Sequence, residues 1–156
     1  MAINVMPVAP ADALALLPLL RDADEGEDRR RAALREPANT AYAAEDGAAR
    51  AGAAVVRWEP AASEILLLAV APEMRRRGTG RAILAALVAE GRRRGTGALL
   101  VGTGNCALGN IAFYQRCGFR MDHIRRDYFA YVQPPISENG IPLLDMIIFR
   151  YALAGE

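Results

Sequence analysis

One stretch near the middle of the chain limits the possible folds more than any other feature. The apolar run 65–68 predicts a strand that is buried on both faces. Gly78 and Gly80 then precede the segment 81–94, whose apolar residues recur at helical spacing, and the run 98–101 is again almost wholly apolar. A strand, a glycine-containing turn, a helix and a second strand form a crossover unit. The sequence therefore predicts a mixed α/β (α+β) fold.

The remaining segments continue this alternation without an internal repeat or a low-complexity linker, which predicts one domain over residues 1–156. Strands are expected at 1–6, 40–45, 49–58, 63–70, 98–101, 119–131 and 143–153. Helices are expected at 13–20, 24–34, 81–94 and 107–117, the second of them so rich in charge that it lies on the surface or covers a cleft. The segment 133–142 is longer than a turn requires and indicates a functional loop.

Composition excludes several classes of function. All 19 basic residues are arginine, so the chain has no lysine for a Schiff base or for a phosphate-binding G-x-x-x-x-G-K-[ST] loop. A net charge of +1 argues against a dedicated nucleic-acid binder. No run approaches the ~20 apolar residues of a membrane span, and the first ten residues lack the pattern of a signal peptide. We therefore expect a cytoplasmic protein without nucleic-acid or membrane partners.

The few cysteine and histidine residues limit metal and triad chemistry. One histidine and two cysteines do not supply a zinc cage from a single chain, and a nucleophilic triad would depend on His123 alone. Cys106 and Cys117 flank a predicted helix and lie too far apart for a disulfide, so both are expected to be reduced thiols. We expect no metal.

The segment between the first buried strand and its helix has the features of a diphosphate site. Glycines at a helix start let several backbone N–H groups approach one point, where the helix adds partial positive charge. A capped helix with solvated arginines is the alternative interpretation. The charged side chains that could contact a diphosphate here are Arg75, Arg76, Arg77 and Arg81.

Two motifs resemble those of a known family. The segment 75–80 is similar to the Q/R-x-x-G-x-G/A loop, and the segment 113–119 to the F-Y-x-x-x-G-F motif, of the GNAT superfamily of acyl-coenzyme A dependent N-acetyltransferases. The resemblance is strongest over 64–119, and the chain resembles the small bacterial single-domain members. It implies a central mixed, mostly antiparallel sheet of about seven strands with a splayed parallel pair, flanked by about four helices.

The resemblance also implies a cosubstrate and a reaction. Acetyl-CoA would lie with its pantetheine in the gap between the splayed strands, and a neutral amine would attack the thioester directly. A backbone N–H near Val70 would stabilise the oxyanion, and Tyr114 would protonate the departing thiolate; a core aromatic is the alternative role for Tyr114. The expected cofactor contacts are Ala69, Val70, Arg75, Arg76, Arg77, Gly78, Thr79, Gly80, Arg81, Asn105, Asn110, Phe113 and Tyr114.

One position departs from the family pattern. Ala107 stands where the family often has an asparagine that contacts the pantetheine. Asn105 is our preferred substitute, with Asn110 and Thr103 nearby. Each of these side chains has an alternative role in capping the helix that begins near Ala107.

The general base and the acceptor site are less strongly indicated. Glu64 shares a strand face with the apolar residues that precede the cleft, so it is the candidate base, with an exposed carboxylate at a strand end as the alternative interpretation. His123 is a second candidate, although a lone strand histidine is more often structural. Carboxylates beside aromatic rings suit a cationic amine. The alternative is that these side chains lie on the surface and bind no ligand. The candidate acceptor residues are Asp127, Tyr128, Glu138 and Asp145.

The sequence thus favours an N-acetyltransferase that acts on a primary amine of a small molecule. A non-catalytic acyl-CoA sensor and an acetyltransferase of protein N-termini or lysines are the alternatives, and a homodimer is possible. Retention of Tyr114 favours the enzyme, whereas Ala107 favours the sensor. The sequence does not identify the acceptor.

Overall fold

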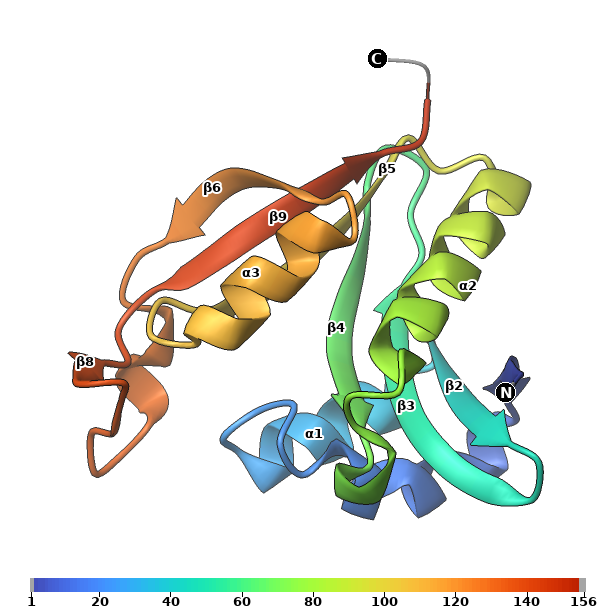
Figure 1. The fold of residues 1–156 in the computed structure, drawn as a ribbon, viewed down its shortest axis with the longest axis horizontal. Helices are drawn as coiled ribbons and strands as arrows, with labels where there is room; N and C mark the ends of the chain where they lie inside the picture. The colour runs from blue at the N-terminus through green and yellow to red at the C-terminus, as the bar shows by residue number, and fades with distance from the viewer. Residues whose placement is uncertain (1, 155–156) are drawn as a thin grey trace.

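A computed structural model describes residues 2–154 (Figure 1). Seven strands form one sheet in the order β1-β2-β3-β4-β5-β9-β6, and β7 and β8 form a separate small sheet. The strands are β1 (Ile3–Val8), β2 (Asn39–Asp46), β3 (Ala49–Arg57), β4 (Ser63–Val70), β5 (Ala98–Gly104), β6 (Arg120–Arg125), β7 (Ser137–Glu138), β8 (Ile141–Pro142) and β9 (Met146–Ala152). The helices are η1 (Pro10–Leu20), α1 (Glu27–Arg35), η2 (Pro72–Met74), α2 (Thr79–Arg94), α3 (Leu108–Arg116) and η3 (Tyr128–Tyr131), where η marks a 3-10 helix.

The large sheet contains one parallel pair of strands, β4 and β5. These strands are paired only from Ser63↔Leu99 to Ile65↔Val101, after which they separate. The other pairs in the sheet are antiparallel. This arrangement, together with η1, α1, α2 and α3, confirms the mixed, mostly antiparallel sheet with a splayed parallel pair and about four helices.

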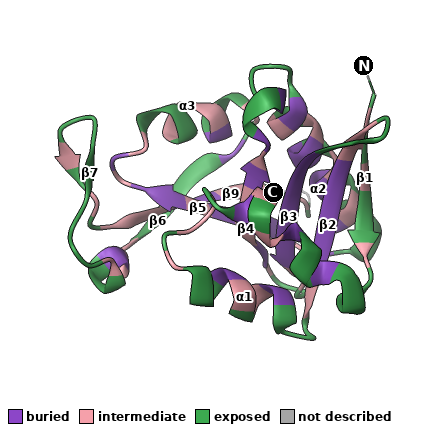
Figure 2. Cartoon of the chain, turned by 90° about the horizontal axis from the view of Figure 1, so that it is seen from below, coloured by how far each residue is buried: buried purple, intermediate pink, exposed green. Residues whose placement is uncertain are grey.

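The helices cover both faces of the sheet, and this explains the apolar character of β4. Residues of α2 and α3 pack on one face in a cluster that includes Ile65. Residues of η1 and α1 pack on the opposite face in a second cluster that includes Leu67. Ile65 and Leu67 lie on opposite faces because Leu66 is an extra residue that interrupts the regular alternation of side chains. β4 is thus buried on both faces, as expected, and Figure 2 shows the buried residues gathered along the central strands.

Two predicted elements differ in the structure. The first helix is a 3-10 helix that contains Pro18, a residue without a backbone N–H to donate to an α-helical hydrogen bond. The strand expected over 119–131 ends at Arg125, because Asp127 adopts a left-handed conformation (φ 56°) and the chain then forms η3. The Asp145 carboxylate accepts a hydrogen bond from the Asp127 N–H at 2.8 Å and so fixes this bend.

Within residues 2–154, no helix combines sufficient length with sufficient hydrophobicity to cross a bilayer.

Candidate functional site

The gap between β4 and β5 exposes backbone hydrogen-bonding groups. The Ala71 N–H donates to the Ala51 carbonyl of β3 at 2.8 Å. Backbone groups of successive strand residues point to alternate sides, so the N–H and C=O groups of Leu68 and Val70 point away from β3 and into the gap. The Val70 carbonyl accepts from Arg75 Nε, so the N–H and C=O of Leu68 and the N–H of Val70 are the groups that can bind an extended ligand as an added strand.

A β-bulge accompanies the separation of the two strands. Val55 pairs with Leu67 and Val56 with Ile65, so Leu66 is an extra residue in β4. A bulge bends the strand that contains it. The bend begins where pairing with β5 ends, and it contributes to opening the gap.

The N-terminus of α2 presents backbone N–H groups without internal partners. Gly78 is the N-cap residue, with a φ of 79°, and no side chain caps the helix. The first α-helical bond runs from the Ala82 N–H to the Gly78 carbonyl at 3.0 Å. The N–H groups of Thr79, Gly80 and Arg81 are therefore available to an external acceptor, and the helix dipole favours an anion there.

Gly80 keeps this helix start open and close to α3. A Cβ at this position would lie 3.0 Å from Cζ of Phe113 and 3.6 Å from a methyl carbon of Val70. Both neighbours line the same cleft as Gly80. A side chain here would therefore crowd the wall of the cleft as well as cover the N–H groups.

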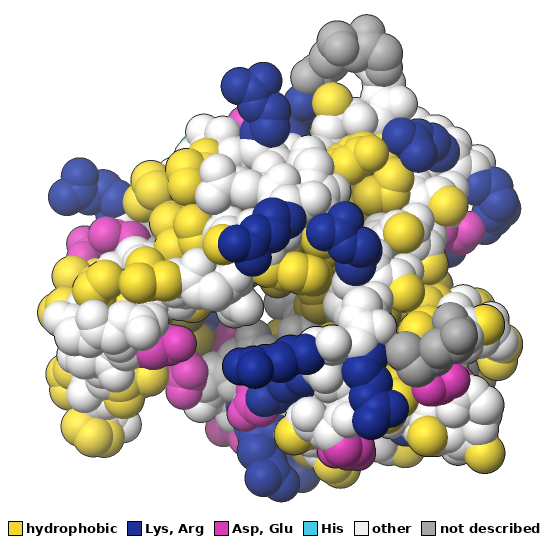
Figure 3. All heavy atoms as spheres, in the orientation of Figure 1, with side chains coloured by type: hydrophobic (Ala, Val, Ile, Leu, Met, Phe, Trp, Pro, Cys, Tyr) yellow, Lys and Arg dark blue, Asp and Glu magenta, His cyan; other side chains and the backbone are white. Residues whose placement is uncertain are grey.

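A cleft with a volume of about 950 Å³ runs past the end of β4 and the start of α2. It includes all the expected cofactor residues except Arg77 and Asn105. Figure 3 shows a hollow on this face with arginine side chains around it. The arginines that line the cleft are Arg21, Arg75, Arg76, Arg81 and Arg116.

Arg75 is already engaged within the protein. Its Nε donates to the Val70 carbonyl at 3.2 Å, and its Nη2 pairs with Asp22 at 2.8 Å. Arg75 therefore ties the glycine loop to the segment between η1 and α1. Arg76 and Arg81 are the better-placed arginines for an anionic ligand.

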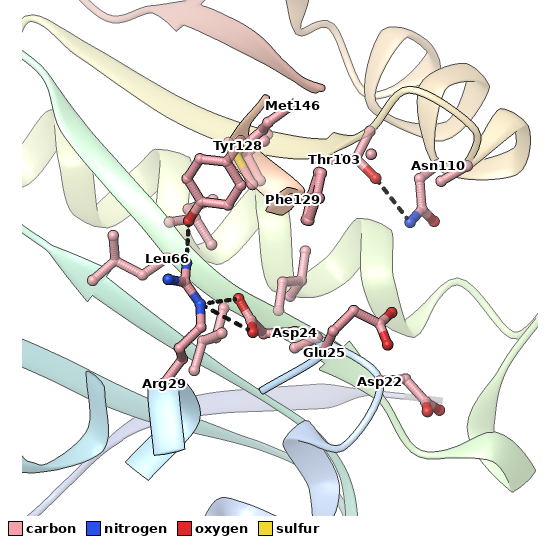
Figure 4. Close-up of a pocket in the computed structure, with 18 of the residues that line it drawn as sticks. Asp22, Asp24, Glu25, Arg29, Leu66, Thr103, Asn110, Tyr128, Phe129 and Met146 are labelled. Atoms are coloured by element: carbon pink, nitrogen blue, oxygen red, sulfur yellow. Dashed lines mark hydrogen bonds and ion pairs between the residues drawn. The ribbon is translucent and has the colours of Figure 1, made fainter. Parts of the chain in front are cut away.

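A second cavity, of about 410 Å³, continues from the first between β4 and β5. Both are lined by Leu68, Ala107, Asn110, Tyr114, Asp22, Glu25 and Glu138. These shared residues make the two cavities halves of one cleft. Figure 4 shows the smaller half, with Thr103 and Asn110 on one side and Tyr128 and Arg29 on the other.

Tyr114 lies where the two halves meet. Its ring packs against Phe113, Phe119 and Phe149, with centroids 5.4, 6.1 and 5.6 Å away. Burial raises the pKa of the Tyr114 hydroxyl, and nearby Cys117 raises it further. Within residues 2–154, no group accepts a hydrogen bond from this hydroxyl, so its proton is available to a ligand in the cleft.

The two candidate asparagines have different surroundings. Asn105 donates to the Pro142 carbonyl at 3.0 Å, and its Oδ1 accepts from the N–H groups of Leu144 and Asp145. It holds the loop before β9 and lines neither half of the cleft. Asn110 lines both halves and donates to Thr103 Oγ1 at 3.2 Å. The geometry therefore favours Asn110 over our preferred Asn105.

Glu64 lines the smaller cavity, as its strand face suggested, but its oxygens are occupied. Arg125 of β6 donates to both at 2.8 and 3.1 Å, and Arg57 lies 3.6 Å away. Only 9% of the residue is exposed. Arg125 therefore orients the Glu64 carboxylate and offsets its negative charge.

The other candidate acceptor residues divide into two groups. Tyr128 and Glu138 line the smaller cavity. Asp127 and Asp145 line neither half and bond to each other at the start of η3. His123 is exposed and pairs with the adjacent Asp122 at 2.7 Å.

Sequence reasoning did not single out the charged residues between η1 and α1. Asp22, Asp24, Glu25 and Arg29 all line the smaller cavity. The charge density of 24–34 pointed to a segment over a cleft, but it did not indicate which side chains face inward.

Charge differs between the two halves of the cleft. The larger half has five arginines and three carboxylates, whereas the smaller has five carboxylates and Arg29. In the smaller half, Glu64, Asp24 and Asp22 are paired with arginines, and within residues 2–154 Glu25 and Glu138 form no ion pair. These two carboxylates lie at the junction with the larger half. No group of three or more His, Cys, Asp or Glu side chains in the described part of the chain is arranged to hold a metal ion.

The sequence matches that of known acetyltransferases. Residues 12–119 match the model of the acetyltransferase (GNAT) family. The uncharacterized N-acetyltransferase YvbK of Bacillus subtilis (strain 168) is 32% identical over 94 residues, which is 60% of this chain and 61% of that protein. The match thus spans less than two thirds of this curated relative.

Two solved structures are similar over nearly the whole chain. An IAA acetyltransferase from Bacillus cereus ATCC 14579 is 30% identical, with a TM-score of 0.87 over 97% of this chain and 100% of that one. A GNAT family acetyltransferase from Elizabethkingia anophelis, solved with acetyl-CoA bound, is 30% identical, with a TM-score of 0.88 over 97% of this chain and 98% of that one.

Proposed function

The chain belongs to the GNAT family of acetyltransferases, and we propose that its single domain transfers the acetyl group of acetyl-CoA to a primary amine of a small molecule. The observation that carries this proposal is the opposite charge of the two halves of the cleft, which meet at Tyr114. The arginine-lined half suits a diphosphate, and the carboxylate-lined half suits an ammonium group.

The cofactor would lie along the larger half of the cleft. Its diphosphate accepts hydrogen bonds from the N–H groups of Thr79, Gly80 and Arg81, with Arg76 beside them. Its pantetheine bonds to the backbone of Leu68 and Val70 in the gap. The acetyl-CoA bound to the Elizabethkingia relative supports this choice of cosubstrate.

Acetyl transfer then occurs at the junction. The lone pair of the neutral amine attacks the thioester carbonyl, and a backbone N–H of β4 at Leu68 stabilises the oxyanion. The intermediate collapses with cleavage of the C–S bond. Tyr114 donates its proton to the departing sulfur, which leaves as the thiol of coenzyme A, and the proton that the acylated nitrogen then loses restores the phenol.

The proton of the incoming ammonium needs an acceptor near the junction. Glu64 stays a prediction for this role, although Arg125 occupies both of its oxygens. Glu25 and Glu138 have free oxygens and line both halves of the cleft. We propose that these two carboxylates bind the ammonium group and receive its proton, with Tyr128 as part of the acceptor wall.

Glu138→Gln should lower kcat/KM for the amine about tenfold, mainly by raising its KM, because a charge-assisted hydrogen bond is worth ~1.5–3 kcal/mol. The KM for acetyl-CoA should change little, since none of the proposed diphosphate and pantetheine contacts involves Glu138. Steady-state kinetics with each substrate varied would measure both values. Glu27→Gln, an exposed change on α1, is the matched control. Equal amine KM values in the two variants would contradict this role of Glu138.

The rate should not fall at moderately alkaline pH. Burial raises the pKa of Tyr114 above its ordinary value of 10.0, so the phenol stays protonated as the pH rises towards that value. We expect kcat to increase as the amine loses its proton and then to remain level up to about pH 10. The prediction is contradicted if kcat of the wild type falls below that pH while kcat of Tyr114→Phe does not. Tyr114 would then ionise with its ordinary pKa.

A thiol-release assay across a panel of acceptors tests the proposed function. Small cationic amines should release coenzyme A from acetyl-CoA faster than anionic or hydroxyl compounds of similar size. Acetyl-CoA binding without release for any acceptor would instead support a non-catalytic sensor. Faster release with hydroxyl or anionic acceptors would contradict an amine site.

A further inference from the structure

A set of aromatic and charged side chains joins the two walls of the acceptor cavity. We call Asp24, Arg29, Tyr128 and Tyr131 the strap. Asp24 lies just before α1 and Arg29 in its first turn, whereas Tyr128 and Tyr131 come from η3, about 100 positions later in the chain. Figure 4 shows Arg29 reaching across to Tyr128, with Asp24 beside it.

The strap is held by several contacts at once. The Arg29 guanidinium donates to the Tyr128 hydroxyl and lies 4.1 Å from the ring centroid of Tyr131 and 5.2 Å from that of Tyr128. The Tyr131 hydroxyl donates to Asp24 at 3.0 Å. Asp24 in turn accepts from the Gly26 N–H at 2.8 Å and from Arg29 Nε at 3.3 Å. A cation between two rings, fixed by a carboxylate, resists displacement.

These contacts leave the strap itself unable to bind an acceptor cation. The oxygens of Asp24 are used by Arg29, Tyr131 and the backbone of Gly26. Arg29 places a positive charge at this end of the cavity. Glu25 and Glu138, which form no ion pair within residues 2–154, line the part of the cavity next to the cofactor half. The strap therefore forms a wall at the end of the cavity away from the reacting groups.

The volume behind this wall limits the acceptor. At about 410 Å³, the cavity lies near the lower end of the range for small-molecule sites, ~300–1,000 Å³. A polypeptide that placed its amine at Tyr114 and ran on past Arg29 and Tyr128, which line the cavity, would meet the contact between α1 and η3 that the strap makes. We propose that Arg29 determines acceptor size: by closing this wall, it admits small amines and excludes extended ones. The inference rests on the proposed function, because it concerns the acceptor of the same transfer.

The test compares two acceptors that carry the same reactive amine. The first is the best small amine from the panel described above, and the second is that amine extended by an uncharged tetraglycine tail. The wild type should acetylate only the small form efficiently. Arg29→Ala should raise the ratio of kcat/KM for the extended form to that for the small form about tenfold or more, because the change removes the hydrogen bond and both ring contacts of the guanidinium.

Two further variants make the result interpretable. Tyr131→Phe keeps the ring but removes the bond to Asp24, so it should shift the ratio in the same direction by a smaller factor. Arg31→Ala, on the exposed side of α1, should not shift it. Because the ratio does not depend on the fraction of active enzyme, partial misfolding of a variant does not change it.

The outcomes separate this inference from the proposed function. Acetylation of small amines by the wild type, with an unchanged ratio in Arg29→Ala and Tyr131→Phe, would overturn the role of the strap and leave the proposed function intact. Equal use of both forms by the wild type would also overturn it. Failure to acetylate any small amine would overturn the proposed function and the strap together.

Discussion

Gly80→Asp should strongly weaken acetyl-CoA binding while leaving the protein folded. The substitution places a carboxylate beside the N–H groups of Thr79, Gly80 and Arg81, where the diphosphate would lie. Two unit charges 4 Å apart repel by about 4 kcal/mol at an effective dielectric constant of about 20. After screening by salt we expect the Kd to rise about 100-fold or more. Isothermal titration calorimetry with acetyl-CoA would measure the change.

Gly80→Asn is the matched control for this variant. It has nearly the volume of aspartate and the same close approach to Phe113, 3.0 Å from the Cβ position, but no charge. If Gly80→Asn loses less affinity than Gly80→Asp, the difference between the two losses measures the repulsion between the aspartate and the diphosphate. Unchanged affinity in a folded Gly80→Asp protein would place the cofactor elsewhere.

Tyr114→Phe should lower kcat about 10²- to 10⁴-fold, the usual contribution of a positioned general acid. The phenylalanine ring keeps the packing against Phe113, Phe119 and Phe149. The KM for acetyl-CoA should therefore change little. Initial rates with the best amine from the panel would measure both constants.

Tyr151→Phe is the matched control, because it removes a tyrosine hydroxyl that lies outside the cleft. Tyr151 of β9 packs on Phe119 at a centroid distance of 5.2 Å, but it lines neither half of the cleft. Its kcat should equal that of the wild type. If Tyr114→Phe is also fully active, the sulfur receives its proton from water and Tyr114 is a packing residue.

The features that the sequence predicted correctly depend on local patterns. The run 65–68 contributes to the apolar clusters on both faces of the sheet, as a strand buried on both faces must. Gly78 adopts a positive φ that glycine tolerates best. Both follow from residues that are close together in the chain, so a single sequence reveals them.

The features that the sequence did not predict depend on distant contacts. The strand at 119–131 ends early because Asp127 bonds to the Asp145 carboxylate, 18 positions away. The strap joins Arg29 to a tyrosine 99 positions later. Which of several nearby polar residues faces the cleft is decided by such contacts, and periodicity does not encode them.

The same reasoning explains the assignment of the two asparagines. Asn105 lies just beyond the strand predicted at 98–101, as a ligand-binding amide would, but its side chain holds the loop before β9. Asn110 lies one turn into α3 and faces the cleft instead. Asn110 occupies this position only because α3 packs across the end of β5, which is a property of the tertiary structure.

The central claim is that the amine attacks acetyl-CoA directly while both are bound in one cleft. Initial rates measured with the amine and acetyl-CoA varied together test this claim most directly. Direct transfer requires a ternary complex, so double-reciprocal plots should give lines that intersect. Parallel lines would show that the acetyl group is first transferred to the enzyme and would contradict the account.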